Sequence, residues 1–403
     1  MAVAFVLFGV ASAASGPSLA ATTTSAATTT TRKDAEKPVR SAGATPPPRA
    51  AVLPVVPPTD STVFASPGPF VPGVLTIDVP SRGPGGRATK AEVWYPVAPL
   101  SSRQIVTRKT YDLKEWLPAG PRKALGTKAG RLFTTNAAEG EKIAPGGPFP
   151  VVVFSHGLAG FRVESAFLTT HLASWGFIVI APDHPGHSLT AVLSSTVSAD
   201  ATSGVNDLAA SVVALGRSPL RAGADLFNLA VIGRSTGGDT AIRWGADEPR
   251  VQGIVVLAGG VGAPRDPLRP ILFMAAANDQ VVRAQSIQAA YRSSQSPKRL
   301  IMLNDSGHLS FTDVCTIAAD PGGLWREIMR LGAKAQDRAK VLLTDGCSAP
   351  NAPFANAWPV VNSSVVAQLR SVFGSGTPGF ALDQTTLDTL ASRGAVKSRF
   401  TIG

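Results

Sequence analysis

The fold-determining segment of this chain reads Leu229-Ala-Val-Ile-Gly-Arg-Ser-Thr-Gly-Gly-Asp-Thr240. Its apolar run through Ile232 predicts a buried strand, and the pattern from Asp239 to Trp244 is typical of a helix. Between them lies Ser235, at a sharp turn, with a glycine two residues to either side. The glycines suit a turn in which strand and helix pass close to each other. The segment therefore predicts a nucleophilic serine held clear of the backbone; a serine that merely caps the helix is the alternative.

Strand and helix patterns alternate on both sides of this turn. Apolar runs predict strands at residues 71–79, 91–97, 149–154, 177–181, 251–257, 271–276 and 300–303, and helical patterns occupy 165–174, 205–215 and 360–373. Such alternation predicts right-handed βαβ units. We expect an α/β fold with one mostly parallel central sheet, helices on both of its faces, and antiparallel strands at its N-terminal edge.

The length of 403 residues, 44% of them hydrophobic, is sufficient for one large α/β domain with appendages. Residues 1–15 resemble a secretory signal peptide, because an apolar run is followed by the small-residue triplet Ala11-Ser12-Ala13. No basic residue precedes the run, so either the true start lies upstream or the signal is weak. Residues 16–66 are rich in Ala, Thr and Pro and predict a disordered linker. We expect the catalytic domain to span 67–403, with a basic insertion at 100–147.

The formal net charge is +11, and part of the excess lies in residues 103–131. Eight basic residues stand there against Asp112 and Glu115: Arg103, Arg108, Lys109, Lys114, Arg122, Lys123, Lys128 and Arg131. We interpret the segment as a solvated loop, with contact to anionic lipid or cell wall as the alternative. No aromatic interleaving or groove-reading motif accompanies it, which argues against a nucleic-acid partner.

The expected state of the two cysteines, Cys315 and Cys347, depends on whether the protein is exported or cytosolic. In an exported protein we expect them to form a disulfide, which would stabilise the fold by about 3–4 kcal/mol on the chain-entropy model. In a cytosolic protein they would be two buried thiols. The N-terminal sequence favours the disulfide.

The general base of such a site should be a histidine, since its pKa lies near neutral pH. His308 follows the last predicted strand and lies downstream of both the serine and the candidate acid. That order, Ser then Asp then His, is the one this architecture uses. The other histidines are His156, beside the expected oxyanion turn, His171, within a helix, and His184 and His187, in one loop. The last pair has a spacing that would suit a metal, but no carboxylate or cysteine cluster supports it, and no metal site is predicted.

The acid that orients His308 is predicted to be Asp279, which follows the apolar run 271–276. Asp305 is the alternative, but a residue three positions from His308 on one loop is poorly placed to orient the ring. The oxyanion that forms during attack needs preorganised backbone N–H donors. We expect them at Thr236, at the helix N-terminus after the nucleophile, and at Leu158, in the loop after the strand 149–154.

These motifs resemble the plasma-type platelet-activating-factor acetylhydrolases and the related bacterial lipase-like and dienelactone-hydrolase-like α/β-hydrolases. The resemblance covers residues 70–315 and is carried by Phe154-Ser-His-Gly-Leu-Ala-Gly-Phe-Arg162, His171-Leu-Ala-Ser-Trp-Gly-Phe-Ile-Val179 and His308-Leu-Ser-Phe-Thr-Asp313. It implies an α/β-hydrolase fold and the same nucleophile, base and oxyanion donors. Two features depart from the family. No carboxylate stands in Leu257-Ala-Gly-Gly260, where the acetylhydrolases carry their acid, and Arg234 stands where histidine is commoner.

The sequence thus predicts a secreted serine esterase, extracellular, periplasmic or associated with the cell wall, that acts on small or lipid esters as a monomer. It requires neither a metal nor an organic cofactor. Phe161, Val163, Phe167 and Leu168 would form either a lipid-docking patch or, as their helical spacing more often indicates, core. A polyester or cutin hydrolase and an exported acyltransferase would use the same triad and stay open as alternatives. A non-catalytic binding protein is disfavoured because all three triad members are present.

Overall fold

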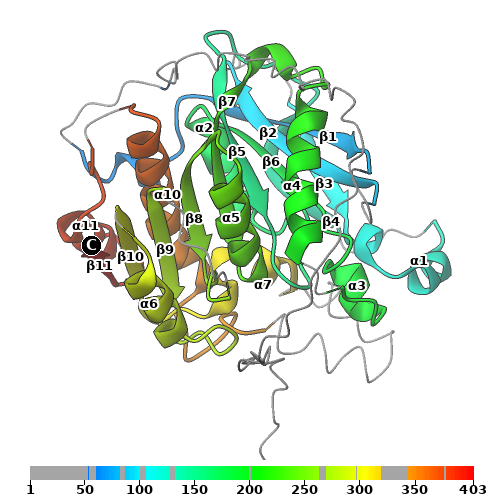
Figure 1. Cartoon of the computed structure of the whole chain (residues 1–403). Helices are drawn as coiled ribbons and strands as arrows, with labels where there is room; N and C mark the ends of the chain where they lie inside the picture. Colours follow the sequence, from blue (N-terminus) through cyan, green and yellow to red (C-terminus); the bar gives the residue numbers. More distant parts are fainter. Residues whose placement is uncertain are drawn as a thin grey trace, which may run out of the picture. The chain divides into compact units, whose positions relative to one another are not determined.

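A computed structural model gives the fold of the chain (Figure 1). It describes residues 53, 60–81, 87–99, 106–127, 132–198, 201–262, 269–295, 297–318, 344–375 and 378–403. The chain divides into two units, residues 1–47 and 48–403, and every described residue belongs to the second. The predicted signal peptide and most of the predicted linker lie outside the described residues.

The described part of the chain forms an 11-stranded sheet in the order β11-β10-β9-β8-β7-β5-β6-β2-β1-β4-β3. Its strands are β1 Val71–Val79, β2 Thr89–Val97, β3 Arg108–Asp112, β4 Leu132–Glu139, β5 Phe149–Ser155, β6 Ile178–Pro182, β7 Ala224–Arg234, β8 Val251–Leu257, β9 Ile271–Ala276, β10 Lys298–Leu303 and β11 Ser398–Ile402. The six strands from β10 to β6 pair in parallel. β2 is antiparallel to both β6 and β1, as predicted for the N-terminal edge. The parallel strands therefore end at one common edge of the sheet, which is where catalytic loops gather in such folds.

Helices cover both faces of the sheet (Figure 1). They are α1 Ala119–Leu125, α2 Ala166–Ser174, α3 Leu189–Leu193, α4 Ala201–Leu215, α5 Thr236–Asp247, α6 Ala284–Ser293, α7 Val314–Ala318, α10 Trp358–Val372 and α11 Gln384–Ser392. Short 3-10 turns are η1 Val63–Ala65, η2 Leu113–Trp116, η3 Arg221–Gly223, η4 His308–Phe311 and η5 Phe354–Ala357. No described helix combines the length and apolar character needed to cross a bilayer.

The continuous apolar character of the central strands is explained by two hydrophobic cores, one on each face. In β5, Val152 and Phe154 belong to the core that includes α2 and α10, whereas Val151 and Val153 belong to the core that includes α4, α5 and α6. Successive strand residues point to opposite faces, so a strand covered on both sides has no polar positions. This burial makes the central strands a rigid support for the loops at their carboxyl ends.

The folded unit begins earlier than residue 67, so the predicted linker boundary is wrong. Phe64, in η1, is only 2% exposed and packs edge-to-face on Trp175 and Phe380. Its backbone carbonyl oxygen lies 2.8 Å from His171 Nε2. A single aromatic side chain within a Pro-rich stretch carries no periodic signal, which is why the sequence did not reveal it.

The predicted insertion at 100–147 contributes β3, η2, α1 and β4 and so extends the sheet at one edge. Tyr111 of β3 is buried there and donates a hydrogen bond to Glu92 of β2. At the opposite edge β11 pairs antiparallel with β10. No sequence pattern predicted β11, whereas β10 corresponds to the strand predicted at 300–303.

The four apolar residues considered for lipid docking belong to the core. Phe161, Val163 and Leu168 are fully buried, and Phe167 stacks on Trp358 of α10 with ring centroids 4.6 Å apart. Phe161 and Val163 precede α2, and all four side chains pack in the core, so the lipid-docking interpretation of these residues is wrong.

Candidate active site

Ser235 occupies a strained turn between β7 and α5. Its backbone has φ 54° and ψ −124°, a left-handed conformation that non-glycine residues rarely adopt. A Cβ on Gly233 would lie 2.1 Å from the carbonyl oxygen of Gly237, so strand and helix meet without room for a side chain. The flanking glycines permit this contact, and the turn holds the serine side chain at the carboxyl edge of the sheet.

His308 and Asp279 meet Ser235 from the ends of two other strands. Asp279 follows β9, and His308 opens η4 after β10. His308 Nε2 lies 3.0 Å from Ser235 Oγ, and His308 Nδ1 lies 2.8 Å from Asp279 Oδ2. The side chains of His308 and Asp279 are almost fully buried. The structure thus brings the three predicted residues into one hydrogen-bonded line.

The Asp279 carboxylate is fixed on its other side by its own loop. Its Oδ1 accepts hydrogen bonds from the N–H groups of Val281 at 2.8 Å and Val282 at 2.7 Å. Asp305, the alternative acid, is exposed, and its backbone carbonyl accepts a hydrogen bond from Ala352 instead. Among the carboxylates of the described residues, only that of Asp279 is within hydrogen-bond distance of the His308 ring.

Asp345 is a residue of this site that the sequence analysis missed. Its Oδ2 accepts hydrogen bonds from the backbone N–H of His308 at 2.9 Å and of Gln280 at 3.2 Å, so it ties together the loops of the base and the acid. It lies two residues before Cys347, which a disulfide joins to Cys315 of α7. The approach of Asp345 depends on a contact with residues more than 35 positions earlier, for which the sequence carries no local signal.

The loop after β5 lies directly against the serine. A Cβ on Gly157 would come within 2.9 Å of Ser235 Cβ, and one on Gly237 within 2.2 Å of the Ser155 carbonyl oxygen. His156 Nε2 accepts a hydrogen bond from the His184 backbone N–H at 2.8 Å, so its other nitrogen carries the proton and donates to Gly157 O at 2.8 Å. Within the described part of the chain, the Leu158 N–H has no acceptor. Thr236 is the first residue of α5, where the N–H has no intrahelical partner.

A second Ser-His-Asp arrangement lies beneath this loop. His184 Nε2 is 2.9 Å from Ser155 Oγ, and His184 Nδ1 is 2.9 Å from Asp207 Oδ2. Ser155 and His184 have no exposed surface, and burial lowers the pKa of His184 well below its usual value. Burial also raises the pKa of Asp207 to about 7. A substrate carbonyl cannot reach Ser155, so we interpret the arrangement as structural.

The remaining histidines have structural surroundings. The His171 ring contacts the Phe64 carbonyl, and burial lowers its pKa to about 4. His187 stacks on His184 with ring centroids 4.6 Å apart. Among the described residues no group of three or more His, Cys, Asp and Glu side chains could hold a metal ion.

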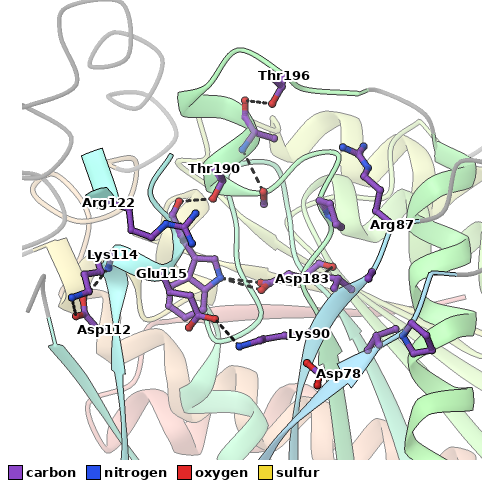
Figure 2. Close-up of a pocket in the computed structure, with 18 residues that line it drawn as sticks. Asp78, Arg87, Lys90, Asp112, Lys114, Glu115, Arg122, Asp183, Thr190 and Thr196 are labelled. Atoms are coloured by element: carbon purple, nitrogen blue, oxygen red, sulfur yellow. Dashed lines mark hydrogen bonds and ion pairs between the residues drawn. The ribbon is translucent and has the colours of Figure 1, made fainter. Parts of the chain in front are cut away.

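A cavity of about 1060 Å³ opens at the same edge of the sheet, beside the loop after β6 (Figure 2). Figure 2 shows Arg87 on one side of it and Lys114 and Arg122 on the other. Acidic and basic side chains occur in equal numbers in its lining: Asp78, Asp112, Glu115 and Asp183, and Arg87, Lys90, Lys114 and Arg122. The lining loop also borders the loop after β5, since His187 O accepts a hydrogen bond from the Ala159 N–H. The cavity therefore offers a surface with equal numbers of acidic and basic side chains near the candidate site.

Comparison with known proteins shows two similarities. The chain resembles a ferulic acid esterase from Streptomyces cinnamoneus, with a TM-score of 0.55 and 23% identity over 79% of this chain and 95% of that one. The chain whose structure is described above therefore has an α/β-hydrolase fold. Residues 123–217 of the chain also match the family model "Platelet-activating factor acetylhydrolase, isoform II". That match ends before Ser235 and includes the loop after β5, and it supports an ester hydrolase that resembles the acetylhydrolases.

Proposed function

We propose that this protein is an exported serine ester hydrolase in which Ser235, His308 and Asp279 form the catalytic triad. The observation that carries the proposal is the continuous line from Ser235 Oγ to His308 Nε2, at 3.0 Å, and from His308 Nδ1 to Asp279 Oδ2, at 2.8 Å. Residues from three strand ends meet in the geometry that activates a serine hydroxyl.

In the proposed reaction, Ser235 Oγ attacks the ester carbonyl carbon while His308 Nε2 takes the hydroxyl proton. The ester C–O bond then breaks, the departing alcohol receives that proton from His308, and the acyl group stays on Ser235. Water attacks the acyl-enzyme, again with His308 as base, and the carboxylic acid is released. Asp279 holds the ring in the tautomer that this sequence requires and stabilises its charged form.

Leu158 and Thr236 are the proposed oxyanion donors. The Gly157 carbonyl and the Leu158 N–H belong to one trans peptide unit and point in opposite directions. Because His156 holds that carbonyl, the Leu158 N–H is turned away from His156, on a loop that lies against Ser235. The Thr236 N–H comes from the N-terminus of α5, where the helix dipole favours negative charge.

For the substrate we propose small or short-acyl esters, including lipid esters. The family match to platelet-activating factor acetylhydrolases supports hydrolysis of an acetyl or similarly short ester. The named activity of the structural neighbour, a ferulic acid esterase, is a further candidate class. Export is supported by the Cys315–Cys347 disulfide, because such bonds persist mainly in oxidising compartments, and by the apolar N-terminal run. We propose a monomer as the active form.

The test measures hydrolysis of p-nitrophenyl acetate, butyrate and palmitate by the full chain and by Ser235→Ala. We expect the variant to lose activity by about 10⁴-fold or more, and we expect acetate to be cleaved faster than palmitate. Ser155→Ala is the matched control, since Ser155 also lies beside a histidine and an aspartate, His184 and Asp207, but is fully enclosed. It should remain active and should still be labelled by a fluorophosphonate, whereas Ser235→Ala should not.

Equal rates in wild type and Ser235→Ala, or activity in neither, would contradict the proposal. An alcohol acceptor added to the assay separates hydrolysis from acyl transfer. A predominant transfer product would replace the hydrolase by the acyltransferase alternative while retaining the triad.

A further inference from the structure

Directly before the proposed nucleophile lies a buried ion pair whose charges need an explanation. Arg234 Nε lies 2.7 Å from Glu164 Oε1, and Arg234 Nη2 lies 2.8 Å from Glu164 Oε2. The two side chains are 3% and 0% exposed. Removing such a pair from water is unfavourable enough that well-packed apolar residues often stabilise a fold equally well or better. The two parallel hydrogen bonds, in contrast, fix the orientation of the Glu164 carboxylate and its distance from the Arg234 guanidinium.

Glu164 also contacts the oxyanion loop and the segment that follows the turn of the base. Its Oε1 also accepts a hydrogen bond from the Gly157 N–H at 3.3 Å, in the loop that carries Leu158. Its backbone carbonyl accepts a hydrogen bond from the Asp313 N–H at 2.7 Å, just after η4, the turn that begins at His308. The neighbouring Ser165 Oγ donates to Phe311 O, within η4, at 3.0 Å. One residue thus links the nucleophile turn, the oxyanion loop and the loop of the base.

The bond to Gly157 has a specific consequence for the oxyanion loop. Glu164 holds the Gly157 N–H, and His156 holds the Gly157 carbonyl. Both peptide units that flank Gly157 are therefore fixed, and the orientation of the Leu158 N–H follows. The Arg234 side chain fixes the Glu164 carboxylate, and its backbone precedes Ser235. Any shift of Glu164 would move the donor relative to the nucleophile.

We propose that Glu164 and Arg234 are positioning residues for catalysis: the pair sets the placement of the Leu158 N–H and the His308 loop relative to Ser235. The proposal rests on the proposed function, because it assumes that Ser235 attacks and that Leu158 stabilises the oxyanion. Neither side chain touches the reacting atoms.

The test compares Glu164→Gln, Arg234→Lys and the double variant Glu164→Met with Arg234→Met. We expect Glu164→Gln to lower kcat for p-nitrophenyl acetate by about 10- to 100-fold, as a donor misplaced by about 1 Å would, with KM within about twofold of wild type. Each single change leaves a buried charge without its full partner, so the Tm should also fall. The double variant removes both charges, so its Tm should recover while its kcat stays low.

The double variant is the decisive measurement, because a purely structural pair would recover activity together with stability. Arg234→Lys, which keeps the charge but not the bidentate geometry, should show a smaller loss than Glu164→Gln. The control for burial is Glu92→Gln in β2, which weakens the equally buried contact of Glu92 with Arg162. It should lower the Tm without the loss of kcat.

Two outcomes would overturn the proposal. One is a Glu164→Gln enzyme with wild-type kcat, and the other is a double variant whose kcat recovers with its Tm. Failure of the proposed function would look different, since Ser235→Ala would then keep its activity whatever the Glu164 variants do.

Discussion

At the scale of the residue, a hydrogen-bonding pattern alone does not identify the nucleophile. Ser235 and Ser155 each lie about 3 Å from a histidine whose second nitrogen meets an aspartate. Ser155 is an interior residue of the sheet with no exposed surface, whereas Ser235 retains 6% exposure at a strained turn, beside the proposed donors in the loop after β5 and at the N-terminus of α5. Access and the neighbouring donors distinguish the two serines.

Two single-residue substitutions test which aspartate, Asp279 or Asp305, orients the His308 ring. Asp279→Asn is expected to lower kcat by about 10⁴-fold, because an amide in that place stabilises the wrong tautomer of the His308 ring. KM should change little, since Asp279 is not expected to touch the substrate. The measurement is steady-state hydrolysis of p-nitrophenyl acetate at pH 7–8. Asp305→Asn is the control and should keep its activity; a large loss there with an active Asp279→Asn would reverse the assignment.

At the scale of the element, one carboxyl group links α2 to the loop of the base. Asp313 Oδ2 accepts a hydrogen bond from the Phe167 N–H, in the first turn of α2, at 2.9 Å. A carboxylate at a helix N-terminus is normally favoured, because the dipole and the free N–H groups stabilise its charge. Here full burial outweighs those bonds and raises the pKa of Asp313 to about 7 from its usual 3.8.

This pKa predicts a pH-dependent stability. Because the folded-state pKa of Asp313 lies above the unfolded value, its stabilising contribution is fully present below about pH 4 and is lost as the pH rises through about 7. Asp313→Asn cannot ionise, so its Tm should decline less than that of wild type between pH 4 and 8. Thermal unfolding across that range checks the prediction, with the exposed Asp388→Asn as control. Parallel Tm profiles for wild type and Asp313→Asn would contradict it.

At the scale of the whole molecule, the catalytic unit uses residues on both sides of the boundary predicted at residue 67. Phe64 contacts Trp175, after α2, and Phe380, near the C-terminus, and the Arg370 guanidinium of α10 lies 5.4 Å from its ring centroid. The segment at 60–66 therefore joins elements that are far apart in the sequence.

A truncation series tests this contribution. A chain that begins at residue 48 should unfold in urea like the full chain, whereas one that begins at residue 67 should lose about 3–5 kcal/mol, the usual effect of removing a buried aromatic side chain. Phe64→Ala in the full chain should reproduce most of that loss. Equal stability of the two truncated chains would show that the segment contributes nothing.

The features that the sequence determined by itself are those whose cause is local. The apolar runs of β5, β8 and β9 predicted their strands closely, because a strand buried on both faces needs apolar residues throughout. The turn at Ser235 was predicted because two glycines flank the serine within five consecutive residues, between an apolar run and a helical pattern. Asp279 and His308 were predicted because parallel strands end at one edge, so residues after strand ends come together.

Contacts between residues that are distant in the sequence, within and around that site, followed from the tertiary structure alone. Glu164 contacts Arg234 across 70 positions, Asp345 reaches the backbone of His308 across 37, and residues 108–112 and 132–139 join the sheet as β3 and β4. The physical reason is that hydrogen bonds and packing depend on proximity in space, whereas periodicity and turn chemistry act only between neighbours in the chain.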